Sequence, residues 1–241
     1  MQLELRFTTK DSSLPLDYRP FIMSFFKGAL NKAYSNVFNE MYSKDKIKPK
    51  SFTFSTFFYQ PKIIGDKIEV PSNKFVVTIS SYDYATIMYF YNSLLLRRGN
   101  KFNIPLGNVI TLTSLNIKES EIIQSNEIKI KFISPLLVRQ RENEKDVYLD
   151  FTSPNFNNQL NETVAQFLNT LPTKIADNKI VLTPIKAKRT VVKNMGLKFN
   201  ASFGEFILCG NKEVLNYLLE SGIGSRRGEG FGMFKVIKDE K

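Results

Sequence analysis

Alternating and helical patterns of hydrophobic and polar residues run along the whole chain. Residues 3–7 alternate with period two, which predicts a strand, and an amphipathic helix is expected from Pro20 to near residues 41–44. Strands are then expected at 52–57, 63–70 and 74–80, the middle one as part of a hairpin. A helix at 82–97 and a last strand at 108–117 follow. Without the hairpin strand, this is the order of a ferredoxin-like unit.

The same order of elements repeats from about residue 125. We expect a strand at 127–133, a helix at 159–171 and a long hairpin with strands at 179–192 and 195–209. A helix at 211–220 and a final strand at 231–237 follow. We therefore predict an α+β protein of two tandem ferredoxin-like (βαββαβ) domains, residues 1–120 and 121–241, joined around 118–125. The second domain includes a glycine-rich loop at 222–232.

The first predicted helix has an apolar stripe and a polar flank. The stripe is expected in the core and consists of Ile22, Phe25, Phe26, Ala29, Ala33 and Val37. Lys27, Asn31 and Tyr34 stand at positions i, i+4 and i+7 and are predicted to share the flank beside this stripe. These three side chains are expected to face the edge of the domain.

The composition favours a polyanionic partner. The chain of 241 residues has a formal net charge of +11 and a pI near 9.6, which indicates nucleic acid first and an acidic membrane surface second. No stretch reaches the ~20 apolar residues of a membrane span, and the N-terminus alternates where a signal peptide would be continuously apolar. We expect a cytoplasmic protein with no membrane partner.

The chain contains no histidine and one cysteine, Cys209. This composition excludes Ser-His and Cys-His nucleophilic pairs, His-ligated metal sites and a closed zinc site. Carboxylate sites for Mg²⁺ remain possible, but no paired-carboxylate cluster stands out, and we expect no metal and no cofactor. Any chemistry is predicted to rest on Lys, Tyr, Arg, Ser or backbone groups.

The tail from Gly222 to Phe234 holds five of the twelve glycines and the adjacent residues Arg226 and Arg227. This density of glycine predicts a loop whose backbone N–H groups face an anion, and the two guanidinium groups favour phosphate. The P-loop and the dinucleotide fingerprint do not fit, because both lead from a strand into a helix and the order here is reversed.

The loop resembles the signature G-h-G-x5-G-h-G of the CRISPR-associated Cas-six endoribonucleases, members of the repeat-associated (RAMP) superfamily. Residues 222–224 and 230–232 fit it without a gap, and residues 14–19, 50–55 and 132–138 resemble further segments of that family. The resemblance implies two ferredoxin-like domains and metal-independent cleavage of CRISPR repeat RNA. In that reaction a 2′-hydroxyl attacks the adjacent phosphate and leaves a 2′,3′-cyclic phosphate and a 5′-hydroxyl.

The family commonly uses a tyrosine in the first helix, a histidine just after it and a lysine before the F-T-F-S strand. By resemblance, Lys27 stands at the tyrosine position, and Tyr42, or Lys44 if the loop is ungapped, stands at the histidine position. Lys50 alone is of the expected type. The catalytic candidates are therefore Lys27, Tyr42, Lys44 and Lys50.

The predicted RNA contacts are basic residues and loop glycines. They lie in the segment before the F-T-F-S strand, on the long hairpin and in the glycine-rich loop, at Lys46, Lys48, Lys186, Lys188, Arg189, Lys193, Gly222, Gly224, Arg226, Arg227, Gly230 and Gly232. The predicted partner is CRISPR repeat RNA, with a multi-subunit CRISPR effector complex as a further candidate. A monomer and a homodimer are both compatible with the sequence.

Other interpretations share most of these features. A non-catalytic member of the family that only holds the repeat RNA would share every feature except a catalytically competent region around Lys27 and Lys50. A structural subunit of an effector complex should lack the full glycine signature. A basic protein that docks to a protein partner or an acidic membrane would bind repeat RNA no better than any polyanion.

Overall fold

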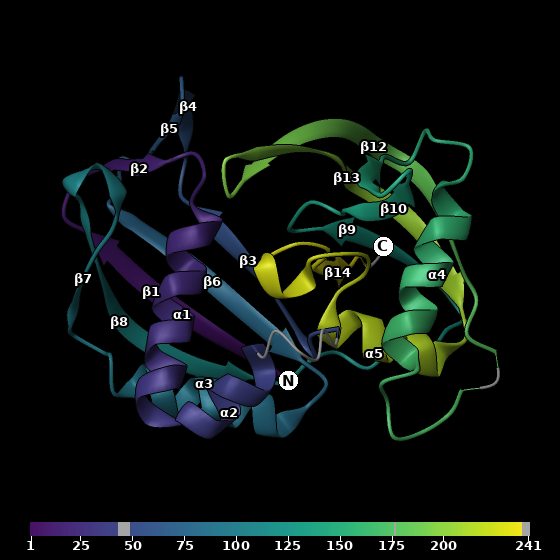
Figure 1. Ribbon diagram of the computed structural model, residues 1–241, viewed down its shortest axis with the longest axis horizontal. Helices are drawn as coiled ribbons and strands as arrows, with labels where there is room; N and C mark the ends of the chain where they lie inside the picture. Colours follow the sequence, from purple (N-terminus) through teal and green to yellow (C-terminus); the bar gives the residue numbers. More distant parts are fainter. Residues whose placement is uncertain (43–48, 176, 238–241) are drawn as a thin grey trace. The chain divides into compact units, whose positions relative to one another are not determined.

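The computed structural model describes residues 1–42, 49–175 and 177–237, and its chain forms two compact units (Figure 1). The first unit comprises Met1–Ile47, Phe54–Glu119 and Lys193–Leu197, and the second comprises Lys48–Thr53, Ser120–Val192 and Lys198–Lys241. Two short segments, 48–53 and 193–197, therefore belong to a different unit from their neighbours in sequence. Within the described ranges, no helix is long and apolar enough to cross a membrane.

The first unit is built on a five-stranded sheet with the strand order β3-β6-β1-β8-β7. Its strands are β1 (Gln2–Thr9), β3 (Phe52–Phe58), β6 (Lys74–Ser81), β7 (Lys101–Asn103) and β8 (Val109–Lys118). The central strand β1 pairs antiparallel with both β6 and β8. Leu3, Leu5 and Phe7 are buried on one face of it, as the period-two pattern predicts.

Helices α1 (Arg19–Ala33) and α3 (Tyr84–Leu95) belong to the same unit and pack on this sheet (Figure 1). The ring of Phe25 on α1 meets that of Phe7 at 5.4 Å, and Phe26 contacts Phe54 of β3 and Phe90 of α3. Such offset and edge-to-face aromatic pairs stabilise a core beyond the area they bury. The apolar stripe of the first helix is thus core from Ile22 to Ala29, as expected.

The long helix expected up to residues 41–44 is interrupted at Tyr34. This residue has a φ of −144° and a ψ of 67°, and α2 (Ser35–Tyr42) starts after it. The Tyr34 ring packs on Tyr89 at 5.1 Å, and its hydroxyl accepts a hydrogen bond from Asn92 of α3 at 3.2 Å. These contacts with α3 replace the predicted continuation of the helix, so Tyr34 does not share the flank of Lys27 and Asn31.

A small sheet with the order β2-β5-β4 completes the first unit. Its strands are β2 (Ser13–Pro15), β4 (Lys62–Ile64) and β5 (Lys67–Glu69). The single strand expected at 63–70 is thus two short strands, because Gly65 adopts a φ of +60° and turns the chain. A one-turn 3-10 helix, η1 (Pro105–Gly107), precedes β8.

The second unit is built on a four-stranded sheet with the order β12-β13-β9-β14. The elements are β9 (Glu127–Phe132), α4 (Phe156–Leu168), β12 (Ile180–Asn194), β13 (Leu197–Gly210), α5 (Lys212–Ser221), η2 (Arg227–Glu229) and β14 (Phe234–Val236). The rings of Phe132, Phe206 and Phe234 meet in its core. Asn211 caps α5 by accepting a hydrogen bond from the Glu213 N–H at 2.9 Å.

Both units repeat the ferredoxin-like order of elements. Numbered within each unit, the four main strands lie in the order two, three, one, four, namely β3-β6-β1-β8 and β12-β13-β9-β14. The predicted fold class is therefore confirmed. A hairpin that the sequence interpretation did not include, β10 (Val138–Glu142) with β11 (Lys145–Leu149), forms a separate two-stranded sheet in the second unit.

Candidate nucleic-acid interface

The glycine-rich loop is packed into the second unit by its own backbone. Gly222, Gly224, Gly230 and Gly232 are buried, and all four have a positive φ. A Cβ at Gly224 would lie 2.4 Å from the Leu137 carbonyl oxygen. Only glycine fits at such a close approach of two backbones. The signature glycines therefore serve packing, and their burial does not support the predicted contact between them and RNA.

The N–H groups of this loop are largely used within the protein. Gly222 donates to Leu218, Ile223 to Gly232, Gly230 to Arg227, Gly232 to Pro135 and Ser225 to Leu137, all to carbonyl oxygens at 2.8–3.0 Å. The expectation of an anion cradle made of backbone N–H groups is thus wrong for these donors. The bonds from Gly232 and Ser225 instead fasten the loop to the segment that leads into β10, and the other three close the end of α5 and the loop itself.

The two adjacent arginines of the loop have different environments. Arg227 is 6% exposed, and its guanidinium lies 3.9 Å from the centroid of the Phe167 ring. A cation held over an aromatic face inside the protein is a structural contact. The prediction that Arg227 flanks RNA is therefore not supported, because its side chain is withdrawn from the surface.

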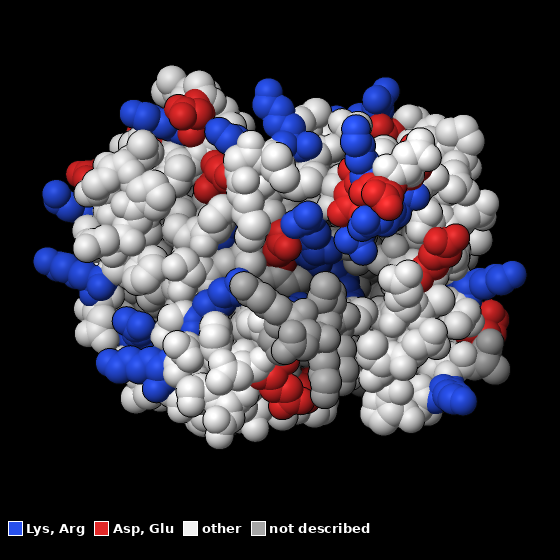
Figure 2. Space-filling view, in the orientation of Figure 1, with Lys and Arg blue, Asp and Glu red and all other residues white. Residues whose placement is uncertain are grey.

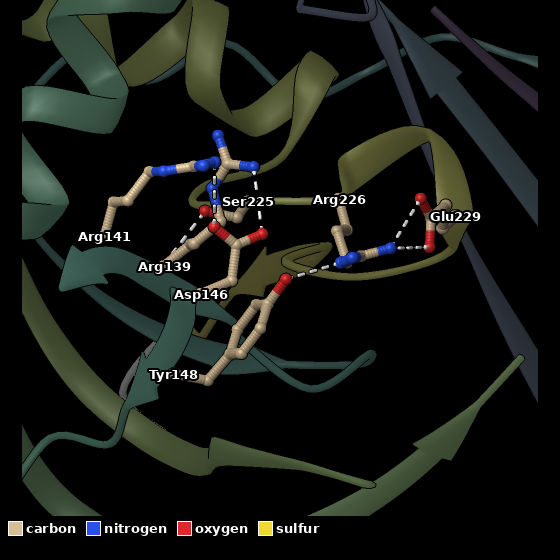
Figure 3. Close-up of polar contacts among 7 residues, drawn as sticks. All are labelled: Arg139, Arg141, Asp146, Tyr148, Ser225, Arg226 and Glu229. Carbon is tan, nitrogen blue, oxygen red and sulfur yellow. Dashed lines mark hydrogen bonds and ion pairs between the residues drawn. The ribbon is translucent and has the colours of Figure 1, made fainter. Parts of the chain in front are cut away.

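Arg226 stays partly exposed and is held in a fixed direction (Figure 3). Its Nε donates to the Tyr148 hydroxyl at 2.7 Å, and its Nη1 donates to both carboxylate oxygens of Glu229 at 3.0 and 3.1 Å. Burial tends to lower the pKa of Arg226, but the hydrogen bond to Tyr148 and the charge of Glu229 outweigh it and raise that pKa. Arg226 is thus a fixed cation with 27% of its side chain exposed.

The hairpin missed in the sequence places two more arginines beside Arg226 (Figure 3). Arg139 and Arg141 lie two residues apart on β10 and share Asp146 of β11, at 3.4 and 3.8 Å. Their side chains are 50% and 68% exposed. The Arg139 backbone N–H donates to the Ser225 hydroxyl at 3.2 Å, which joins this hairpin to the glycine-rich loop. The only sequence signal for it was the polar turn pair 143–144, because residues 138–142 and 145–149 do not alternate apolar with polar positions.

The basic residues predicted on the long hairpin are partly engaged. Arg189 donates to Asp150 at 2.9 Å, and Lys188 lies 5.8 Å from the Phe203 ring centroid. Burial tends to raise the pKa of Asp150, but hydrogen bonds from Thr152 and the charge of Arg189 lower it overall. Lys186 is exposed, and Lys193 lies in the hairpin tip that belongs to the first unit.

Basic and acidic side chains are intermixed on the face drawn in Figure 2. A net charge of +11 is thus not gathered there into a single uniform patch. Affinity for a polyanion must therefore depend on the exposure and partners of individual cations.

Lys27 lies in an open pocket of the first unit, with a volume of about 340 Å³. Its ammonium is 4.6 Å from the centroid of the Tyr42 ring, and no carboxylate pairs with it among the described residues. Burial raises the pKa of Tyr42, so the phenol stays protonated at neutral pH. The structure thus brings together two of the four catalytic candidates, with Tyr42 able to donate a proton and unsuited to accept one.

The remaining catalytic candidates are placed differently. Lys44, Lys46 and Lys48 lie outside the described residues. Lys50 belongs to the second unit, where its stem lies against the glycine-rich loop: a Cβ at Gly228 would be 2.8 Å from Lys50 Cγ. Three residues on, the Thr53 hydroxyl donates to the Phe231 carbonyl at 2.8 Å. Residues 50–53 are thus docked on the loop, a contact that spacing along the chain could not predict.

Across the ranges 1–42, 49–175 and 177–237, no group of three or more His, Cys, Asp or Glu side chains gathers in a way that could hold a metal ion.

Comparison with known proteins identifies a family. Residues 117–236 match the family model described as CRISPR associated protein Cas6, C-terminal. This range includes the glycine-rich loop, the β10–β11 hairpin and the long hairpin. A search of the curated proteins finds no match to the sequence.

Solved structures share the fold over the whole chain. One, titled as an RAMP protein binding different RNA substrates, has a TM-score of 0.85 and 22% identity and covers 99% of this chain and 100% of its own. Another, a Cas6-related gene product from Pyrococcus furiosus, has a TM-score of 0.87 and 21% identity, covering 100% and 99%. A Cas6 protein titled as a product complex has a TM-score of 0.73 and 12% identity, covering 98% and 99%. These similarities establish the fold.

Proposed function

The chain belongs to the Cas6 family, whose C-terminal model matches residues 117–236, and from this membership we propose that it binds and cleaves CRISPR repeat RNA. Members of this family process CRISPR repeat RNA. The proposed reaction is attack of a 2′-hydroxyl on the adjacent phosphate, with a 2′,3′-cyclic phosphate and a 5′-hydroxyl as products. The family match is the observation that carries the proposal. The RNA bound by the solved protein of similar fold agrees with it.

The first unit supplies candidate groups for this reaction. The transition state places extra negative charge on the phosphate, and a cation fixed beside it stabilises that charge. The Lys27 ammonium faces an open pocket, and no partner carboxylate in the described part of the chain competes for it. Tyr42 holds its proton at neutral pH and can give it to the leaving 5′-oxygen, as a weaker acid than an exposed tyrosine because burial raises its pKa. We assign charge stabilisation to Lys27 and proton donation to Tyr42.

Lys44 and Lys50 stay in the proposed catalytic set. Lys44 falls outside the described residues, and Lys50 lies on the glycine-rich loop of the second unit. Each is tested by its own substitution. A loss of cleavage in either variant does not decide the role of Lys27, which is measured separately.

A second candidate function is retention of repeat RNA without cleavage. The observation that favours it is the absence of histidine, which removes the usual proton carrier at neutral pH. In that case the arginines of the second unit would carry the whole function. The two candidates differ in one measurable quantity, the rate of backbone cleavage.

The test uses purified protein in EDTA with two versions of its host's repeat RNA, which differ by a 2′-deoxy group at the scissile nucleotide. Because the nucleophile is the 2′-hydroxyl, we expect cleavage of the first and none of the second. The deoxy RNA should still bind with similar affinity. Tight binding of both RNAs without cleavage of either would leave the retention function, and cleavage of both would exclude the 2′-hydroxyl mechanism.

Arg141 is expected to act as a phosphate contact. Its side chain is 68% exposed, and its ion pair to Asp146 is long at 3.8 Å, so little free energy is lost when RNA replaces that pair. Arg141→Ala should reduce the slope of log affinity against log salt by about 0.7 to 0.9, depending on strandedness. Binding titrations at several salt concentrations measure this slope.

Lys212→Ala is the matched control for Arg141→Ala, because it removes one exposed charge of the same sign from α5 in the same unit. An equal change in slope for both variants would mean that the RNA senses net charge alone. An unchanged slope for Arg141→Ala would remove this residue from the interface.

A further inference from the structure

The pocket that holds Lys27 also contains groups suited to a nucleobase. Six of its residues come from α1, and they are joined by Phe38 of α2 and Met195 at the tip of the long hairpin. The walls combine apolar side chains with a few polar ones, the usual composition of a small-molecule site. The polar members are Ser24, Lys27 and Asn31.

Met195 occupies this pocket at a cost in backbone strain. It has a φ of +53° and is followed by Gly196 with a φ of +78°, so the hairpin turns through two residues with positive φ. Asn, Asp or Gly usually stand at the first of these positions, and a long apolar side chain there is uncommon. Strain of this kind persists where the surrounding structure holds it and often marks a functional site.

A specific contact within the first unit fixes the turn residues 193–197. The Gly196 N–H donates to Asp17 Oδ2 at 2.8 Å, and segment 193–197 belongs to that unit. Met195 is 52% exposed, so its side chain is a wall of an open pocket and does not fill a core. Its sulfur and methylene groups can lie against the flat face of an aromatic ring.

Asn31 is a polar residue of the pocket with unused hydrogen-bonding capacity. Among the described residues its carboxamide makes no hydrogen bond, and its side chain is exposed. It stands four residues after Lys27, about 6 Å further along the helix axis, and both residues line the pocket. A carboxamide offers one acceptor and two donors, which matches the N6 and N7 edge of adenine.

We propose that this pocket seats an adenine base of the RNA strand, with Asn31 bonded to its N6 and N7 and with Met195 and Phe38 against its faces. The inference rests on the proposed function, because it places the nucleotide next to Lys27 and so next to the scissile phosphate. Single-stranded RNA exposes this base edge to a protein, and such bases are recognised by stacking and edge contacts. Asn31 thereby becomes a specificity-determining residue.

The experiment measures binding of three seven-nucleotide RNAs: all uridine, uridine with one central adenosine, and uridine with one central 7-deazaadenosine. The intact protein should prefer the adenosine RNA over the other two by about tenfold, the effect of a good bidentate contact. Asn31→Ala should bind all three alike. Asn39→Ala, which removes an exposed carboxamide from α2 outside the pocket, should keep the preference.

Met195→Gly tests the wall without a loss of fold. Glycine accepts a positive φ without the strain that Met195 carries, so the variant should be at least as stable to urea. The preference for adenosine should nevertheless fall severalfold, because one face of the base loses its contact. A variant that is equally stable and equally selective would remove Met195 from the pocket's function.

The outcomes separate this inference from the function on which it rests. If repeat RNA binds but the intact protein shows no preference for adenosine, or Asn31→Ala keeps that preference, the adenine pocket is refuted and the proposed function stands. If neither repeat RNA nor the short RNAs bind, the proposed function fails and the pocket assignment fails with it.

Discussion

Replacing Lys27 with alanine is expected to slow single-turnover cleavage of repeat RNA by about 100-fold or more. The affinity for RNA should change by less than about threefold, because one phosphate contact among many contributes little to binding at moderate salt. Cleavage should slow because Lys27 points into an open pocket and pairs with the Tyr42 ring, so its charge is available to the reacting phosphate. Rates and dissociation constants are measured with the normal and the 2′-deoxy RNA.

Lys32→Ala is the control for Lys27→Ala. Lys32 is exposed on the last turn of the same helix, so its loss removes an equal charge without touching the pocket. Tyr42→Phe adds a second comparison, since it keeps the ring under the ammonium and removes only the hydroxyl. A parallel loss of rate and affinity in Lys27→Ala would show that this residue is only a phosphate contact.

The fold was predictable because burial in a sheet depends on local alternation. Leu3, Leu5 and Phe7 alternate in the sequence and are buried in the structure, and the two ferredoxin-like series follow from such patterns alone. The break at Tyr34 was not predictable in this way. It depends on contacts with Tyr89 and Asn92 of another helix, and nothing in the local sequence signals them.

The candidate site was predictable only where one element carries it. Lys27 and Asn31 share a pocket because they are four residues apart on one helix. The roles of Arg226 and Arg227, adjacent in sequence, could not be separated without the structure. One is held at the surface by Tyr148 and Glu229, and the other is buried on Phe167.

The glycine signature shows why a correct motif can be assigned the wrong physical role. Its spacing identified the family, but the expected role of its N–H groups in anion binding does not agree with their hydrogen bonds to protein carbonyls. Positive φ and close backbone approach are requirements of packing as much as of ligand binding. Sequence alone cannot distinguish these two uses of glycine, because both select the same residue.

This packing role predicts that Gly232→Ala severely destabilises the second unit. Gly232 has a φ of +72°, and a Cβ on it would lie 1.8 Å from the Ile223 carbonyl oxygen. The backbone would have to move, which would disrupt the hydrogen bonds from Ile223 to Gly232 and from Gly232 to Pro135. We expect a loss in the free energy of unfolding of about 4 kcal/mol or more, or a failure to fold, measured by urea denaturation.

Gly65→Ala separates this steric cost from the cost of positive φ alone. Gly65 has a φ of +60°, but a Cβ there would meet no atom within 4 Å, so we expect a loss of only about 1 kcal/mol. Thr53→Val gives a milder perturbation of the same loop, since it removes the hydrogen bond to Phe231 and should cost about 1 kcal/mol. If Gly232→Ala were as stable as Gly65→Ala but bound RNA weakly, the loop glycines would serve RNA contact, and the structural role argued from their burial would be wrong.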